Sequence, residues 1–222
     1  MTPLSYLSFE DWVAHTFDHE VSGQLWYFEA SAEYWQGPPA LTVAYLTRLF
    51  EAPLSFLGSY SDEQLNQGFW YLASNGASDY MFALLEEEVL LEQRVRCIDG
   101  FAVLFEKLFA VKCSPHLSHL DEPGRNPLNA SCYMWWDLLP FCGQPGVAAR
   151  KEIDEACLRA MEATLSLESI ACWESALHGL GHWRHFYPQR VADVVDAFLS
   201  THSEVRADLL RYAHSARHGC VQ

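Results

Sequence analysis

The chain has 222 residues, half of them apolar or aromatic, which is enough to bury a full hydrophobic core. Its 14 Lys and Arg against 29 Asp and Glu give a formal net charge of −15, which repels nucleic-acid phosphates and anionic lipid surfaces. This length allows one large domain or two small ones, and we expect a single ordered domain over residues 1–222 that binds neither nucleic acid nor membrane.

Helix signals begin early in the chain. Ser8 is placed to cap a short first helix. The chain is then broken at residues 37–39, Gly-Pro-Pro, where a second helix can begin, and Pro53 marks the end of that helix. Ser61 stands three residues before Gln64, which is the spacing of a capping box, and it predicts the start of another helix.

The longest apolar period with helical spacing runs from Leu91 to Phe109 and predicts a central buried helix. Residues 113–147 follow and hold five of the ten prolines, so they are expected to form a loop-rich insertion around one short helix at residues 129–138. A helical period returns between Ile153 and Leu165.

The last quarter of the chain, residues 168–219, holds three amphipathic segments joined by almost no connecting sequence. Pro188 opens the second segment, Thr201 and Glu204 have the spacing of a capping box for the third, and Gly219 can end it. No strand pattern interrupts the helical segments. The predicted fold class is all-α, a compact multi-helix domain with stacked helix pairs toward the C-terminus.

Two resemblances refine this prediction. Residues 176–181, ALHGLG, resemble the end of a HEAT-type second helix, where small residues let helices approach closely, and residues 203–206, SEVR, resemble the turn into the next helix. This resemblance implies HEAT-like stacking over residues 168–219. The acidic all-helical character, with the strings SDEQL at 61–65 and CYMWWD at 132–137, resembles the bacterial immunity proteins that accompany polymorphic toxins.

The compartment is predicted from the N-terminus and the cysteines. The first residues show neither the basic start nor the long apolar run of a secretory signal, and no run of about 18 apolar residues follows. Seven widely spaced cysteines without a CxxC pair are typical of free thiols in a reducing compartment. We therefore expect a soluble cytoplasmic protein.

One histidine-rich helix face is the sharpest candidate for chemistry. Glu174, His178, His182 and His185 fall within a sector of about 80° on a helix, and histidines four residues apart can ligate one zinc ion. The order is not HExxH, because Glu174 precedes the first histidine. The favoured interpretation is a polar seam. The alternative is a metal-dependent enzyme that uses Glu174, His178 and His182.

Other catalytic patterns are absent from the sequence. His116, His119 and Asp121 cluster in the proline-rich segment, where local hydrogen bonds of turn residues are the favoured interpretation. The chain has no GxSxG elbow, no GxxxxGK loop and no GxGxxG fingerprint. We therefore expect a protein that is not an enzyme, with no catalytic residue, no metal ligand and no cofactor assigned.

Two features favour protein binding. A run of glutamates precedes and enters the central helix, and its negative field can steer a basic partner. Eight Trp and ten Tyr supply the side chains that are over-represented at interface centres, although burial of the neighbouring tryptophans between helices remains the alternative. The expected partner contacts are Glu86, Glu87, Glu88, Glu92, Trp135, Trp136 and Asp137.

These observations predict a non-enzymatic protein-binding module, and specifically an immunity protein that binds and neutralises a cognate bacterial toxin. The metal-dependent enzyme described above is one alternative. A general helical scaffold is the other, because the same acidic and aromatic surfaces could hold several partners in place of one.

Overall fold

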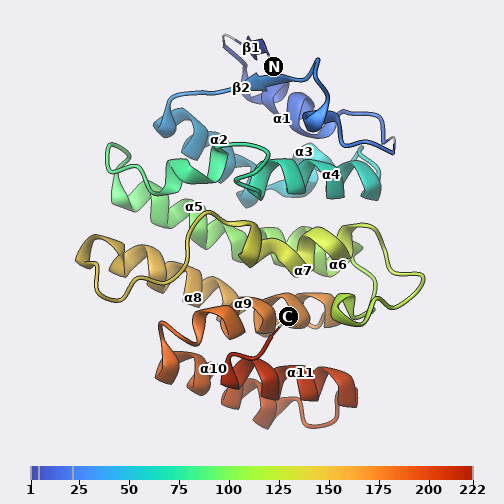
Figure 1. Cartoon of the computed structure of the whole chain (residues 1–222), viewed down its shortest axis with the longest axis vertical. Coiled ribbons are helices and arrows are strands. Elements are labelled where there is room, and N and C mark those ends of the chain that lie inside the picture. Colours follow the sequence, from blue (N-terminus) through green and yellow to red (C-terminus); the bar gives the residue numbers. More distant parts are fainter. Residues whose placement is uncertain (1, 5, 22, 222) are drawn as a thin grey trace.

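The helices stack in layers that follow the chain from one end of the molecule to the other (Figure 1). The computed structural model describes residues 2–4, 6–21 and 23–221. It confirms the predicted all-α class. The helices are α1 (Phe9–Phe17), α2 (Pro39–Glu51), α3 (Pro53–Leu57), α4 (Asp62–Ala73), α5 (Leu91–Leu104), α6 (Ala110–Lys112), α7 (Leu128–Leu138), α8 (Lys151–Leu165), α9 (Ile170–Trp183), α10 (Pro188–Thr201) and α11 (Ala207–His218).

Two short strands lie at the N-terminal end of the stack (Figure 1). β1 (Thr2–Leu4) and β2 (Glu33–Trp35) pair in parallel, with Thr2 opposite Glu33. No strand is predicted from the sequence, because three residues are too few to show the alternation by which a strand is detected. The two strands leave the helical class unchanged.

The predicted helix starts are largely confirmed. The Asp11 amide donates to Ser8 Oγ at 3.1 Å, which caps α1. The capping box of α4 is complete: the Gln64 amide donates to Ser61 Oγ at 3.2 Å, and the Ser61 amide donates to Gln64 Oε1 at 3.0 Å. Pro188 stands at the first position of α10, as predicted.

The predicted capping box at Thr201 and Glu204 is wrong. Thr201 is the last residue of α10, and its hydroxyl hydrogen bonds to the carbonyls of Ala197 and Phe198 in the same helix. α11 begins later, at Ala207, and no side chain caps it. Its C-terminus ends at Gly219 as predicted, with a left-handed φ of 76° that glycine adopts without strain.

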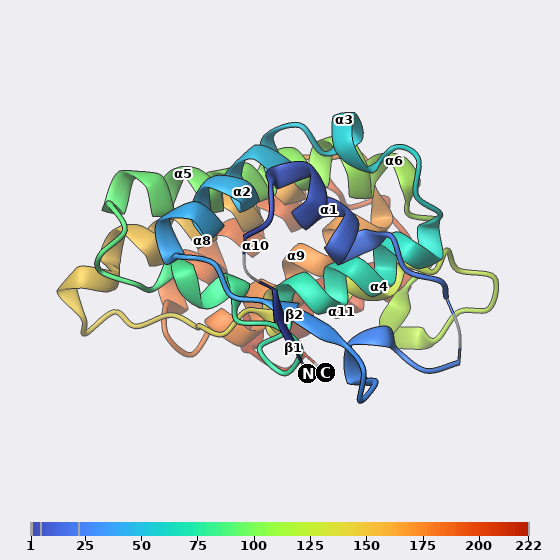
Figure 2. The ribbon, with the colours of Figure 1, turned by 90° about the horizontal axis from the view of Figure 1, so that it is seen from above.

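The α7 helix lies in the interior of the stack, between α4 and α9 (Figure 1). In the view from above, the first helices of the chain lie over the last ones (Figure 2). It is the short helix predicted within residues 113–147. α5 continues into a π-helical turn, Phe105–Phe109, which packs on α7. Trp135 is fully buried among phenylalanine rings, and the Trp136 indole stacks on the Phe105 ring at 5.9 Å.

Burial removes both tryptophans from the predicted partner surface. Trp135 has 0% of its surface exposed and Trp136 has 4%. Aromatic side chains serve both cores and interfaces, and here the position of α7 inside the stack decides for the core. All seven cysteines are free thiols. None of the helices in the described ranges has the length and apolar character needed to cross a bilayer.

Candidate functional site

α7 and α9 approach each other closely at a glycine. A Cβ atom on Gly179 would lie 2.5 Å from Cγ of Trp136, so only glycine lets the α9 backbone rest against that indole. The preceding residue on α9 is His178, and the residue after Trp136 on α7 is Asp137. The glycine contact thus brings an imidazole and a carboxylate from the two helices together.

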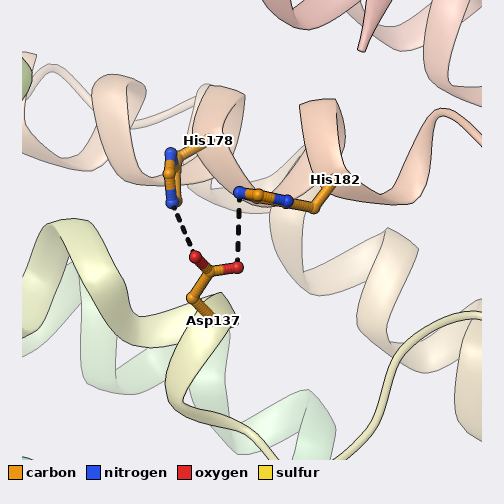
Figure 3. A group of neighbouring side chains, drawn as sticks. All are labelled: Asp137, His178 and His182. Carbon is orange, nitrogen blue, oxygen red and sulfur yellow. Dashed lines mark hydrogen bonds and ion pairs between the residues drawn. The ribbon is translucent and has the colours of Figure 1, made fainter. Parts of the chain in front are cut away.

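Asp137, His178 and His182 form a cluster at this crossing (Figure 3). His178 and His182 project from consecutive turns of α9, and Asp137 projects from the last turn of α7 between them. His178 Nε2 lies 3.2 Å from Asp137 Oδ2, and His182 Nε2 lies 3.4 Å from Asp137 Oδ1. One carboxylate therefore faces two imidazoles at the same time.

Two tyrosines stand behind the buried member of the cluster. The Tyr212 hydroxyl on α11 lies 2.7 Å from His178 Nδ1, and it also lies 3.0 Å from the Tyr133 hydroxyl on α7. The His178 side chain is only 2% exposed, whereas the side chain of His182 is 42% exposed. With both ring nitrogens engaged, His178 is held in one orientation and its Nε2 atom points to Asp137.

The electrostatics of the cluster favour an anionic carboxylate and a neutral imidazole. The hydrogen bond from His178 lowers the pKa of Asp137 below its ordinary value, against the opposing effect of partial burial. Partial burial lowers the pKa of His182, and His178 lowers it further, while Asp137 opposes both. At neutral pH the His182 ring nitrogen accordingly keeps a lone pair available for a proton or a metal ion.

Glu174 does not belong to this cluster. Its carboxylate is fully buried and accepts hydrogen bonds from the Ser118 amide at 2.8 Å, from the His119 amide at 3.0 Å and from His119 Nδ1 at 2.6 Å. Glu174 therefore fixes the proline-rich loop onto α9. The predicted alternative ligand set of Glu174, His178 and His182 is corrected here, because Asp137 takes the place of Glu174.

The other residues of the predicted histidine groups also lie outside the cluster of Asp137, His178 and His182. α9 ends at Trp183, so His185 lies in the turn after the helix and not on the predicted face. His116 Nδ1 lies 2.9 Å from Ser114 Oγ, and Asp121 pairs with Arg125 at 2.8 Å, so these residues make local contacts as the favoured interpretation expected. They do not converge on one point with His119.

The glutamates predicted to contact a partner lie on the surface. Glu86, Glu87, Glu88 and Glu92 are all exposed, and within the described ranges no ion pair neutralises them. They surround Leu90, whose side chain is 60% exposed. We refer to residues 86–92 as the acidic segment. Its charge is therefore available to an external molecule.

An open groove adjoins the acidic segment between α5 and the start of α8. Its volume is about 760 Å³, and Leu90, Leu91 and Val95 supply apolar lining. The carboxylates in its lining outnumber the single guanidinium, Arg96, which is already bound to Glu51 through two hydrogen bonds. The lining carboxylates are Glu51, Glu92, Asp99 and Glu152. The groove thus combines an apolar surface with negative charge.

Sequence reasoning missed the groove and the contact of Asp137 with the two histidines. Asp137 and His178 are 41 residues apart, and His178 and Tyr212 are 34 apart, so no local spacing links them. The one signal was the pair of glycines beside His178, which indicated a close helix contact without naming the partner helix.

Comparisons with protein-family models, curated proteins and solved structures find no match to this chain. Function is therefore inferred from the charge and geometry of the side chains. Two surfaces offer chemistry to another molecule: the acidic segment with its groove, and the cluster of Asp137, His178 and His182.

Proposed function

We propose that this protein is a non-enzymatic binding protein that captures a basic partner protein, specifically as an immunity protein that occludes a bacterial toxin. The acidic segment carries the proposal, since it presents exposed carboxylates without an ion pair beside an open groove. The toxin is proposed as the partner class because of the resemblance to immunity proteins described above. One tight partner is expected for such a role.

The charge of the segment supports a basic partner. Several carboxylates elsewhere on the surface are paired with arginine, as Glu10 is with Arg48 and Asp196 with Arg217. Residues 86–92 leave four carboxylates unpaired in seven positions. A local field of this kind raises the association rate of an oppositely charged partner by about 10- to 1,000-fold at low salt. Rapid capture is useful to an inhibitor that must act before its toxin does.

The groove supports stable binding after the encounter. Leu90 projects into solvent, and Leu91 and Val95 continue the apolar surface into the groove. Apolar contacts in the centre of an interface with charges at its rim are the common arrangement of specific protein complexes. Because Trp135 and Trp136 are buried, we assign the apolar anchor to Leu90 in their place.

The test combines capture with charge variants. The tagged protein is used to isolate a partner from its native cells, and the association rate of the purified pair is then measured at several ionic strengths. Replacing the glutamates at 86, 87 and 88 by glutamine should lower the association rate by about tenfold or more at low salt. Leu90→Ser should instead raise the dissociation rate.

A matched control removes the same charge elsewhere. The control glutamates are also exposed, and among the described residues they also have no ion pair; they lie in the N-terminal part of the chain: Glu20, Glu29 and Glu33. Their replacement by glutamine should change the association rate much less. Equal effects of the two triple variants would show that net charge alone matters and would reject the acidic segment as the site. Several stoichiometric partners would favour the scaffold alternative.

A further inference from the structure

The crossing of α7 and α9 has a donor set that the proposed function does not use. We propose that Asp137, His178 and His182 bind one divalent transition-metal ion, with zinc as the best fit. The donors are two imidazole nitrogens and one carboxylate oxygen, which suit zinc among the common biological metals. This inference is independent of the proposed partner binding, because it rests on different elements of the fold.

The distances match the edges of a metal coordination shell. Ligand atoms at about 2.0–2.1 Å from a tetrahedral zinc ion lie about 3.3–3.4 Å from one another. The two carboxylate-to-imidazole distances here are 3.2 Å, from His178 to Asp137 Oδ2, and 3.4 Å, from His182 to Asp137 Oδ1. Rotation of the Asp137 carboxyl group is therefore needed to place one oxygen on both edges. A charge-assisted hydrogen bond is shorter, at about 2.7–2.9 Å. The carboxylate thus stands close to the separation that a shared metal ion requires, and without the ion its 3.2 Å contact with His178 is a hydrogen bond.

The third edge closes through a mobile side chain. The ligand atoms of all three residues lie within 4.8 Å of one another. His182 is 42% exposed, so its ring can rotate toward His178 without disturbing the core. The two histidines are four residues apart on α9, which places them on the same helix face. Rotation of the His182 side chain would have to bring its ligand atom to about 3.3–3.4 Å from that of His178 to complete the geometry.

The surroundings of His178 are those of a metal ligand. A ligating histidine almost always uses its other ring nitrogen in a hydrogen bond that fixes the ring. His178 Nδ1 has such a contact with the Tyr212 hydroxyl at 2.7 Å, and Tyr133 in turn contacts Tyr212 at 3.0 Å. Metal binding would therefore move the His178 proton from Nε2, where it is donated to Asp137, to Nδ1, where it is donated to the Tyr212 hydroxyl, and leave the Nε2 lone pair for the metal.

The cluster also has an open side. Asp137 and His182 are both exposed, so an ion can enter from solvent without unfolding the crossing. Three protein ligands leave the fourth tetrahedral position to water. Glu174 is held by the proline-rich loop and does not compete for that position.

Zinc titration of the metal-stripped full chain tests the site. Calorimetry should give one saturable site for Zn²⁺, and Co²⁺ should give the strong visible absorption of a tetrahedral complex. His182→Ala should weaken zinc binding by more than about 100-fold, because loss of a supporting hydrogen bond alone weakens it by about 10- to 100-fold. Tyr212→Phe should fall in that smaller range.

α11 provides a matched control. His214 and His218 are likewise four residues apart and exposed, but Asp196 nearby is bound to Arg217. His218→Ala should leave the zinc affinity unchanged. The proposal is overturned if the wild-type chain shows no saturable zinc binding, if His182→Ala binds as tightly as wild type, or if His218→Ala causes the loss. If His182→Ala does not fold, Asp137→Asn serves as the second variant, because it keeps the shape of the side chain. We expect Asp137→Asn to abolish tight zinc binding as well.

Discussion

Gly179→Ala probes the helix crossing on which the histidine cluster depends. The added Cβ atom would lie 2.5, 2.7 and 2.8 Å from three atoms of Trp136. The indole cannot withdraw easily, because it is 4% exposed and stacks on Phe105 with an interplanar angle of 12°. The two helices must therefore separate, or the indole must leave its stacked position.

The size of the effect follows from two opposing contributions. Overpacking a well-filled core destabilises by about 1–3 kcal/mol, and three contacts under 3.0 Å place Gly179→Ala in the upper half of that range. Replacing glycine by alanine inside a helix stabilises by about 1 kcal/mol. The net expectation is a loss of about 1–2 kcal/mol, which lowers Tm by about 2–8 °C for a chain of this size.

Urea unfolding followed by circular dichroism measures this loss, with Gly146→Ala as the control. No atom lies within 4 Å of a Cβ on Gly146, so that variant should change stability by less than about 0.5 kcal/mol. In a Trp136→Ala background, which removes the Cγ and Cδ1 atoms that the new methyl group would meet, the further penalty of Gly179→Ala should be smaller. A Gly179→Ala protein as stable as wild type, or more stable, would refute the close approach of α7 and α9.

Three further predictions concern charged groups. Glu174→Ala should destabilise the chain by about 3–5 kcal/mol in urea unfolding, with Glu174→Gln losing less, because the buried carboxylate binds His119 and two backbone amides. The hydrogen bond from Arg206 lowers the pKa of Glu122 to about 2, so the ionised Glu122 stabilises the fold above its unfolded pKa, and this stabilisation is lost as pH falls toward 2. Glu122→Gln should therefore flatten the dependence of the unfolding free energy on pH in this range. An unchanged pH dependence in the variant would count against the pair. Burial lowers the pKa of His15 to about 4, so proton NMR should show this imidazole titrating near pH 4, and titration near 6.5 would contradict its packing.

Local signals predicted the helices well where the stabilising contacts are local. The Ser61 and Gln64 box was predicted because both partners stand within one turn. The capping box predicted at Thr201 and Glu204 is not formed, because a contact with a distant part of the chain decides where α11 begins. The guanidinium of Arg206, the residue before α11, binds Glu122, 84 residues away, and His202 stacks on Phe198 to extend the end of α10.

The candidate sites divide in the same way. The exposure of Glu86 to Glu88 could be predicted, because three consecutive charged side chains are too costly to bury in a helical core. The fate of Trp135 could not be predicted from its residue type, because aromatic side chains fill cores and interfaces alike. The pairing of Asp137 with His178 depends on which helix packs against α9, and this is a property of the tertiary fold alone.

Hydrogen exchange of the chain with and without its captured partner tests the central proposal most directly. The amides of residues 86–92 and of the first turns of α5 should exchange more slowly in the complex, because the partner covers the acidic segment and its groove. Protection confined to α10 and α11, with residues 86–92 exchanging as in the free chain, would contradict the assignment of this surface.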